Sequence, residues 1–168
     1  MKAKYVGLLV LLLAGIILLP YADGAVKTTV GWVENVRVYP GNLLVEARID
    51  TGADTSSLHC DCITSFDRNG EKWVSFVVET SDGKPHLMER KVVRMVKIKR
   101  HFGEVQERMV VKLGVCVGKI YKETEVTVVD RSGLTYPMLV GRDFLERGFL
   151  VDPSVSHKTE PQCKVPNK

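Results

Sequence analysis

The chain has 168 residues, of which 45% are hydrophobic and 26% are charged. This composition is typical of one globular domain with a short additional segment, and it excludes a disordered chain and a coiled coil. The formal net charge of +4 is small for this length, so it gives no reason to expect nucleic acid as a partner.

The first 24 residues differ in character from the rest of the chain. Lys2 and Lys4 precede an unbroken apolar run at residues 6–19, and Pro20 and several small residues follow it. The run is shorter than the roughly 20 residues that a membrane-spanning helix needs. We therefore interpret residues 1–24 as a signal peptide, cleaved after Gly24, which directs the protein to the periplasm or the exterior. The alternative is an uncleaved signal anchor in the inner membrane that faces the periplasm.

Residues 25–153 are predicted to form an all-β domain. Short alternating or β-branched segments are separated by turn signals at intervals of roughly ten residues, which favours a closed barrel or a sandwich. A single short helix is predicted at residues 141–147, and residues 154–168 are polar and are expected to form a flexible tail. The predicted strands span residues 30–38, 43–49, 73–78, 92–98, 105–113, 123–129 and 150–153.

The tetrad Asp50-Thr51-Gly52-Ala53 is the most informative motif of the chain. It follows a predicted strand and opens a loop of small residues. Backbone N–H groups of such a loop can hold a carboxylate, and the Thr51 hydroxyl can lock the loop. This arrangement suits a carboxylate that activates a water molecule. The triplet alone is also good turn chemistry, so a second motif is needed to support the interpretation.

That second motif lies about 90 residues further along, where Leu139-Val140-Gly141 precede the predicted helix. Together, residues 47–55 and 139–143 resemble the paired motifs of retropepsin-like aspartic proteases. The resemblance implies a single-lobe acid-protease barrel in which Asp50 is catalytic. It also implies that Thr51, Gly52 and Ala53 form the active-site loop, with structural support from Asp54, Leu139, Val140, Gly141 and Arg142. In retropepsins, the positions of Asp54 and Arg142 form a pair, which we expect to be partly buried here.

A narrower resemblance covers roughly residues 29–152. It is to a bacterial family labelled "ATP-dependent zinc protease", which is associated with ATP-grasp peptide ligases of the RimK type. The chain contains no H-E-x-x-H and no Gly-rich phosphate loop, so an aspartic protease without metal or other cofactor is chemically more coherent than the label. The matching segments are residues 31–34, 58–59, 73–76, 130–132 and 136–142, besides the Asp50 motif.

An aspartic protease needs two carboxylates around one water molecule. The chain offers only Asp50 in the right context, so the second carboxylate is expected from Asp50 of another copy in a homodimer. A lesser alternative is Asp143 of the same chain. A flap is also expected over a peptide or protein substrate, with its tip at residues 81–84 or 100–103. The basic residues at 91–100 alternate with apolar ones, which indicates a solvated strand face whose charge favours acidic peptides.

Two further functions remain as alternatives. One is a non-catalytic periplasmic peptide-binding module on the same fold, and the other is a zinc-dependent peptidase. Cysteine and histidine near the motif do not have the usual spacing of zinc ligands. We expect disulfides instead, either two bridges that join Cys60 and Cys62 to Cys116 and Cys163, or one bridge with two free thiols. Trp32, Trp73 and Phe76 are interpreted as core or sheet residues.

Overall fold

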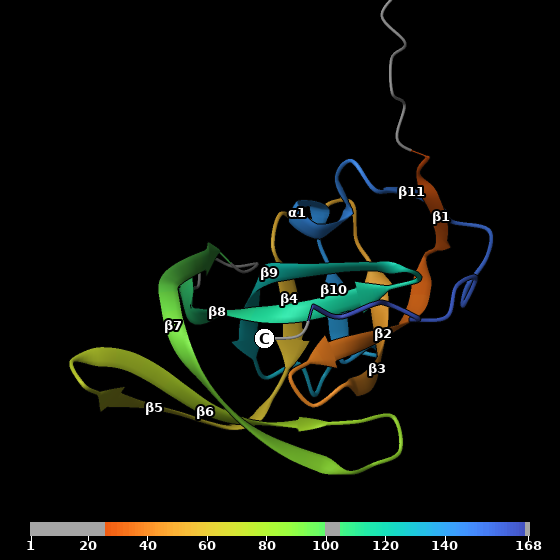
Figure 1. The fold of residues 1–168 in the computed structure, drawn as a ribbon. Coiled ribbons are helices and arrows are strands. Elements are labelled where there is room, and N and C mark those ends of the chain that lie inside the picture. The colour runs from red at the N-terminus through yellow and green to blue at the C-terminus, as the bar shows by residue number, and fades with distance from the viewer. Residues whose placement is uncertain (1–25, 100–104, 167–168) are drawn as a thin grey trace, which may run out of the picture.

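A computed structural model describes residues 26–99 and 105–166 of the chain. The fold is all-β with one short helix, and β strands follow one another along almost the whole described chain (Figure 1). The elements are β1 (Thr28–Gly31), β2 (Val33–Tyr39), β3 (Leu43–Ile49), β4 (Ser56–His59), β5 (Asp61–Arg68), β6 (Glu71–Glu79), β7 (Pro85–Lys99), β8 (Val105–Val117), β9 (Ile120–Val129), β10 (Met138–Val140), α1 (Arg142–Leu145) and β11 (Phe149–Asp152).

Six strands close into a barrel in the order β2-β3-β10-β4-β9-β8, because β8 also pairs with β2. Inward-facing residues of these strands alternate with outward-facing ones, as the two-residue period of a strand requires. The core is therefore built from valines and leucines such as Val36, Val45, Leu58 and Leu113, all nearly inaccessible to solvent. The closed barrel that the sequence predicts is confirmed, and the closure leaves these six strands without an open edge.

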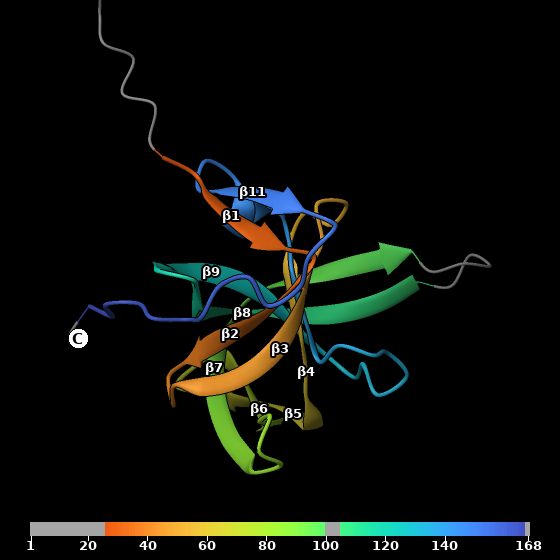
Figure 2. The same cartoon turned by 90° about the vertical axis from the view of Figure 1, so that its right-hand side faces the viewer.

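The remaining strands of the large sheet form an arm. β7 pairs with β8 and continues past the barrel, and β6 and β5 add to its far edge. The arm lies at the opposite end of the molecule from α1 and the small sheet of β1 and β11 (Figures 1 and 2). Phe76 and Met88 on its inner face belong to the same core as the barrel residues. The arm is thus packed against the barrel by its apolar face.

The predicted strands are present, with differences at their ends. Trp32 divides the predicted strand at residues 30–38 into β1 and β2, and the helix is shorter than expected. The sequence did not predict β4 and β5, whose segments SSLH and DCITSFDR are mostly polar. Their strand conformation comes from pairing with β9, β10 and β6, which overrides a weak local preference.

The segment after Ser154 was expected to be flexible, but residues 155–163 are bound to the barrel. The carboxylate of Glu34, which is fully buried, accepts hydrogen bonds from the backbone N–H groups of Lys158 (3.0 Å) and Thr159 (2.9 Å). A disulfide joins Cys116 in β8 to Cys163. These contacts hold the C-terminal segment along the barrel surface.

Candidate functional site: the Asp50 loop

Asp50 lies directly after β3, at one end of the barrel. Its backbone N–H donates to the carbonyl of Val140 (2.9 Å), and the preceding Ile49 N–H donates to Trp32 (2.8 Å). The side-chain oxygen Oδ1 accepts hydrogen bonds from the backbone N–H groups of Gly52 (2.9 Å) and Ala53 (3.2 Å). The loop therefore fixes the carboxylate through the backbone, as its sequence predicts.

The other oxygen of Asp50 faces a cation. Arg48 Nη2 donates to Asp50 Oδ2 at 2.5 Å. Partial burial raises the pKa of Asp50, but the hydrogen bond and charge of Arg48 and the N–H groups of Gly52 and Ala53 outweigh burial and hold the pKa below its usual value. In the single protomer Asp50 is therefore ionised at neutral pH, which is the state of a general base.

The second motif crosses the Asp50 loop. β10 pairs in parallel with β3, and the chain after it donates backbone hydrogen bonds to the loop, from Arg142 to Ala53 (2.9 Å) and from Asp143 to Asp54 (3.0 Å). A Cβ atom at Gly141 would lie only 2.6 Å from the Asp54 carbonyl oxygen. Glycine is needed at this position because two backbone segments touch.

The predicted pair of Asp54 and Arg142 exists, since Arg142 Nη2 contacts Asp54 Oδ1. The expectation that the pair is partly buried is wrong, because the side chain of Asp54 is 77% exposed and that of Arg142 is 50% exposed. The loop turns these side chains outward, away from the core. Arg142 also donates to the carbonyl of Thr51 (2.9 Å), so it braces the Asp50 loop from the solvent side.

Three further side chains near Asp50 were not predicted as site residues. Arg131 is half-buried in the segment between β9 and β10, and its guanidinium donates to Ser57 Oγ (2.9 Å). Burial lowers the pKa of Arg131, as do the charges of Arg108 and Arg48, whereas the charge of Asp50 raises it. Arg131 therefore lies within electrostatic reach of Arg48 of β3, Arg108 of β8 and Asp50. No local sequence pattern links them, because β sheet pairing brings them together.

Trp32 lies beside the same loop. It is 41% exposed rather than buried, and its ring meets that of Tyr136 edge-on at 5.7 Å. The expectation of core or sheet residues is confirmed for Phe76, which is fully buried in β6, and for Trp73, which lies in the same strand. It is not confirmed for Trp32, which lies between β1 and β2. The Asp50 end of the barrel thus offers an exposed aromatic surface near Arg48 and Arg131.

Asp143, the alternative second carboxylate, accepts a hydrogen bond from Thr55 Oγ1 (3.3 Å) through its own Oδ2. Within residues 26–99 and 105–166, the recorded partners of the Asp50 carboxylate are Arg48, Gly52 and Ala53. None of them is a carboxylate.

The two candidate flap tips differ in position. Both the N–H and the hydroxyl of Ser81 donate to the Leu44 carbonyl (3.0 Å each). Leu44 is the second residue of β3 and Asp50 follows the end of that strand, so the two are about 20 Å apart at the usual rise of a strand. The tip at residues 81–84 is therefore remote from Asp50. The tip at residues 100–103 lies outside the described residues.

The four cysteines follow the second of the two expected arrangements. One bridge joins Cys116 and Cys163, while Cys60 and Cys62 are free thiols. Cys60 is buried, and burial raises the pKa of its thiol. Across the described residues, histidine, cysteine and carboxylate side chains form no group of three suited to a metal ion. In the same part of the chain, no helix is both long and apolar enough to cross a membrane.

Comparisons with known proteins agree with the geometry of the site. The chain is 37% identical over 115 residues to a probable alpha-L-glutamate ligase from Shewanella halifaxensis and 32% identical over 118 residues to one from Desulfotalea psychrophila. The matches cover 67% and 66% of this chain but only 25% of each ligase. The chain therefore spans about a quarter of the length of these relatives.

A solved structure of a Legionella pneumophila protein of unknown function is also similar. It has 31% sequence identity and a TM-score of 0.69, and the match covers 80% of this chain and all of the other. A family model described as retropepsin-like aspartic endopeptidase RimB matches residues 29–162, which include the Asp50 loop and the segment that crosses it. The chain belongs to this RimB-like family of retropepsin-like proteins.

Proposed function

We propose that the protein is an aspartic endopeptidase that hydrolyses peptide bonds with Asp50. The observation that carries the proposal is the orientation of the Asp50 carboxylate. Two backbone N–H groups hold one oxygen, and the second motif holds the loop from behind. A carboxylate fixed in this way keeps its position during proton transfer without reorganising the loop.

The proposed active enzyme is a homodimer. Each protomer supplies one Asp50, and the two carboxylates approach across a two-fold axis and share one proton around a water molecule. The ionised carboxylate takes a proton from the water, which attacks the scissile carbonyl. The protonated one donates to the leaving nitrogen. The close approach of two like charges raises one of the two pKa values, so the pair titrates as a unit.

The proposed substrate is a glutamate-rich peptide. Arg48 contacts Asp50 and Arg131 lies within its electrostatic reach, and cations beside a site attract acidic chains. A segment similar to this chain forms a quarter of proteins named for glutamate ligation, which supports a link to ATP-grasp ligases. Because residues 1–24 have the pattern of a signal peptide, we further propose that the enzyme works in the periplasm.

Peptide cleavage by purified residues 25–168 tests the proposal. An oligoglutamate peptide and an oligoglutamine peptide of equal length are incubated in excess EDTA from pH 3 to pH 8, and products are identified by mass spectrometry. We expect cleavage of the oligoglutamate, with at least a thousandfold loss in Asp50→Asn, which keeps the loop hydrogen bonds. Asp143→Asn is the matched control and keeps activity.

Three outcomes would contradict the proposal. Cleavage that stops in EDTA would favour the zinc-dependent alternative. Cleavage by a protein that is strictly monomeric would reject the dimer. Binding of the peptide without cleavage, by a folded protein, would favour a peptide-binding module on the same fold.

A further inference from the structure

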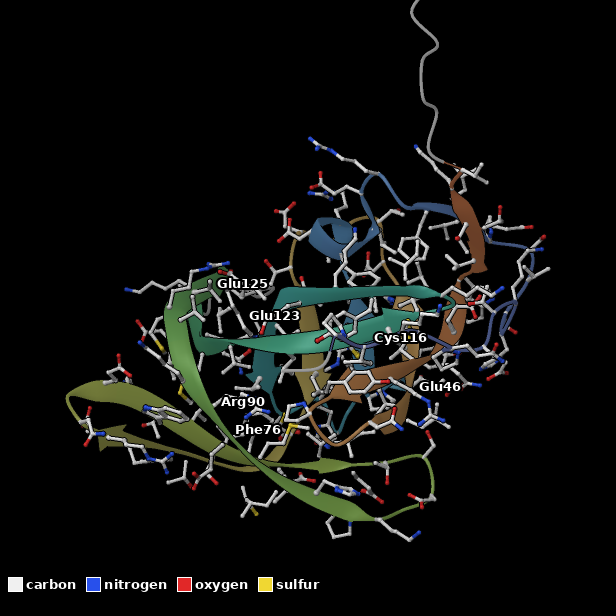
Figure 3. The ribbon with its side chains drawn as sticks, viewed as in Figure 1. Glu46, Phe76, Arg90, Cys116, Glu123 and Glu125 are labelled. Atoms are coloured by element: carbon white, nitrogen blue, oxygen red, sulfur yellow. A yellow bond between two sulfur atoms is a disulfide. The ribbon has the colours of Figure 1, made fainter. Side chains whose placement is uncertain are left out.

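A groove of about 820 Å³ lies between the arm and the barrel, away from Asp50. Its lining comes from β2, β6, β7, β8 and β9 and from the end of the C-terminal segment. Arg90 of β7 and Glu123 of β9, labelled in Figure 3, belong to its two sides. Tyr39 lies six residues along β2 from Val33, which pairs with Arg48 beside Asp50. The groove is thus about 20 Å from the Asp50 loop at the usual strand rise.

The floor of the groove is aromatic. The rings of Tyr39 and Tyr121 meet edge-on at 5.7 Å, and both line the groove. Gly114 lies beneath them, and a Cβ atom there would be 2.3 Å from the hydroxyl oxygen of Tyr121. Glycine in the middle of β8 usually weakens a strand. Here it makes room for the Tyr121 ring in the floor of the groove.

Arg90 of β7 lies at a position where the alternation of the strand predicts an apolar residue. On β7, Met88 faces Phe76 and Arg90 faces Val74, so Arg90 lies on the inner, apolar side of the arm. Burial lowers the pKa of Arg90. Its guanidinium donates to the backbone carbonyl of Glu89 (2.7 Å), a neutral acceptor, and within residues 26–99 and 105–166 no carboxylate pairs with it. Placing a half-buried charge in this way is costly unless an anion pairs with it.

A second polar group of the lining lies on the other face of the arm, because Trp73 pairs with Lys91 whereas Arg90 pairs with Val74. The indole Nε1–H of Trp73 is buried and has no acceptor within the described residues, and Trp73 lines the groove. A buried donor without an acceptor is costly, because it has lost its hydrogen bonds to water. Such groups are rare in folded proteins and point to a ligand that supplies the acceptor. A β-bulge between Val92 and Arg94 reshapes β7 at this point.

The rim adds two more cations. Lys91 and Lys112 line the groove together with Arg90, against the single carboxylate of Glu123. Lys91 is in contact with Glu71 on the neighbouring strand, which leaves Arg90 and Lys112 as the cations that face a ligand. An extended acidic peptide matches this surface, because its carboxylates can pair with the cations and its carbonyl groups can accept from Trp73.

We propose that the groove is an exosite that binds an acidic peptide segment of the substrate at a distance from the scissile bond. The proposal rests on the proposed function, since it assumes that the peptide bound at the groove is also the one cleaved at Asp50. At the length of an extended chain, about six residues span the 20 Å between the two sites. Long acidic peptides therefore engage both sites, and short ones engage only one.

Fluorescence tests binding to the groove without any cleavage. The chain contains two tryptophans, one beside Asp50 and one in the groove. In the variant Asp50→Asn/Trp32→Phe, Trp73 is the only reporter. We expect a saturable change in its emission on titration with dodecaglutamate, and none with dodecaglutamine. The matching variant Asp50→Asn/Trp73→Phe reports from Trp32 at the other end of the barrel.

Removing one positive charge inside the groove and one outside it distinguishes specific binding at the groove from general electrostatic attraction to a basic protein. Arg90→Gln is expected to weaken dodecaglutamate binding at least tenfold. Arg94→Gln removes the same charge from the same strand, where Arg94 pairs with Glu125 at 2.7 Å outside the groove, and is expected to change binding less than twofold. If Arg90→Gln disturbs the fold by circular dichroism, Lys112→Gln replaces it.

Equal losses of dodecaglutamate affinity in the two arginine variants would overturn the exosite. A change in the emission of Trp32 without a change in that of Trp73 would also overturn it. With Asp50 intact, Arg90→Gln is expected to raise KM for dodecaglutamate about tenfold and to leave KM for tetraglutamate unchanged. Equal effects on both lengths would also overturn it. Failure of cleavage with binding at Trp73 preserved would reject the proposed function and keep the groove as a binding site for acidic peptides.

Discussion

The two ends of the barrel both combine a tryptophan with arginines, but they use their polar groups differently. At the Asp50 end, Arg48 binds the carboxylate and Arg131 binds Ser57. In the groove, Arg90 binds only a backbone carbonyl of its own strand, and the Trp73 N–H has no acceptor in the described chain. At the first end, Arg131 Nε likewise has no acceptor in the described chain. The two ends therefore differ in how their charges are paired: Arg48 binds the Asp50 carboxylate, whereas Arg90 has no carboxylate partner among the described residues.

This difference separates a carboxylate that the chain itself holds in place from a cation that the proposed exosite would use to bind a ligand. The Asp50 loop is held by short-range backbone contacts, so its geometry is independent of any substrate. The groove has an aromatic floor and uncompensated positive charge, which is the composition of a recognition surface. We expect substitutions at the two ends to change stability and activity independently of each other.

The largest effect is expected from removal of the disulfide. Cys116 and Cys163 are 47 residues apart in sequence, and a loop of that length contributes about 4 kcal/mol to stability in the chain-entropy account. Cys116→Ala/Cys163→Ala should therefore lower the free energy of unfolding by about 2–4 kcal/mol in urea. Cys62→Ala, at an exposed free thiol, is the control and should have little effect. A loss below about 1 kcal/mol in the double variant would contradict the prediction.

Two glycines allow a direct comparison between the ends. Gly141→Ala brings Cβ within 2.6 Å of a backbone atom. Because the backbone there cannot move independently, we expect the free energy of unfolding to fall by about 3 kcal/mol. Gly114→Ala meets only the side chain of Tyr121, which can rotate away. It should cost about 1 kcal/mol and disturb binding in the groove. Urea unfolding measures both variants, and equal losses would reject the distinction between backbone and side-chain contact.

A smaller effect is expected at Arg142. Its pair with Asp54 is exposed, so Arg142→Ala should reduce stability by less than about 1 kcal/mol. Activity should fall about tenfold, because the hydrogen bond to the Thr51 carbonyl is lost as well. Arg142→Lys keeps the charge but not the two-pronged geometry, and serves as the control. A decrease of several kcal/mol in the free energy of unfolding, measured by thermal unfolding, would contradict a small contribution from this exposed pair.

The smallest effect concerns pH. Arg48 holds the pKa of Asp50 below 3.8 in the folded protomer, so Asp50 contributes stability that is present above that value and lost as pH falls through the folded pKa. In Arg48→Gln the pKa rises, so this acid-sensitive contribution shrinks, and the acidic limb of the activity profile moves to higher pH. Lys97→Gln, on the exposed side of β7, is the control. An acidic limb at the same pH in both variants would contradict the role of Arg48.

Much of the Asp50 end was predictable because its parts are local or carry a distinctive pattern. Asp50, Gly52 and Ala53 are neighbours in sequence, and their hydrogen bonds follow from one turn of the chain. Gly141 was also predictable from its motif, although it lies 91 residues away. The exposure of Asp54 and Arg142 was not predictable, because it depends on which side of the loop faces the core.

The amino-acid sequence by itself determined the alternating strands, the Asp50 loop and the segment that crosses it, since these depend on local preference and on close backbone contact. The pairing of β4 and β5, the choice of disulfide, the arginines around Asp50 and the groove were decided only by the tertiary structure. Each of these requires residues from strands that are distant in sequence. Barrel closure sets their neighbours, and a strand's own sequence specifies which of its faces is buried but not which strand it meets.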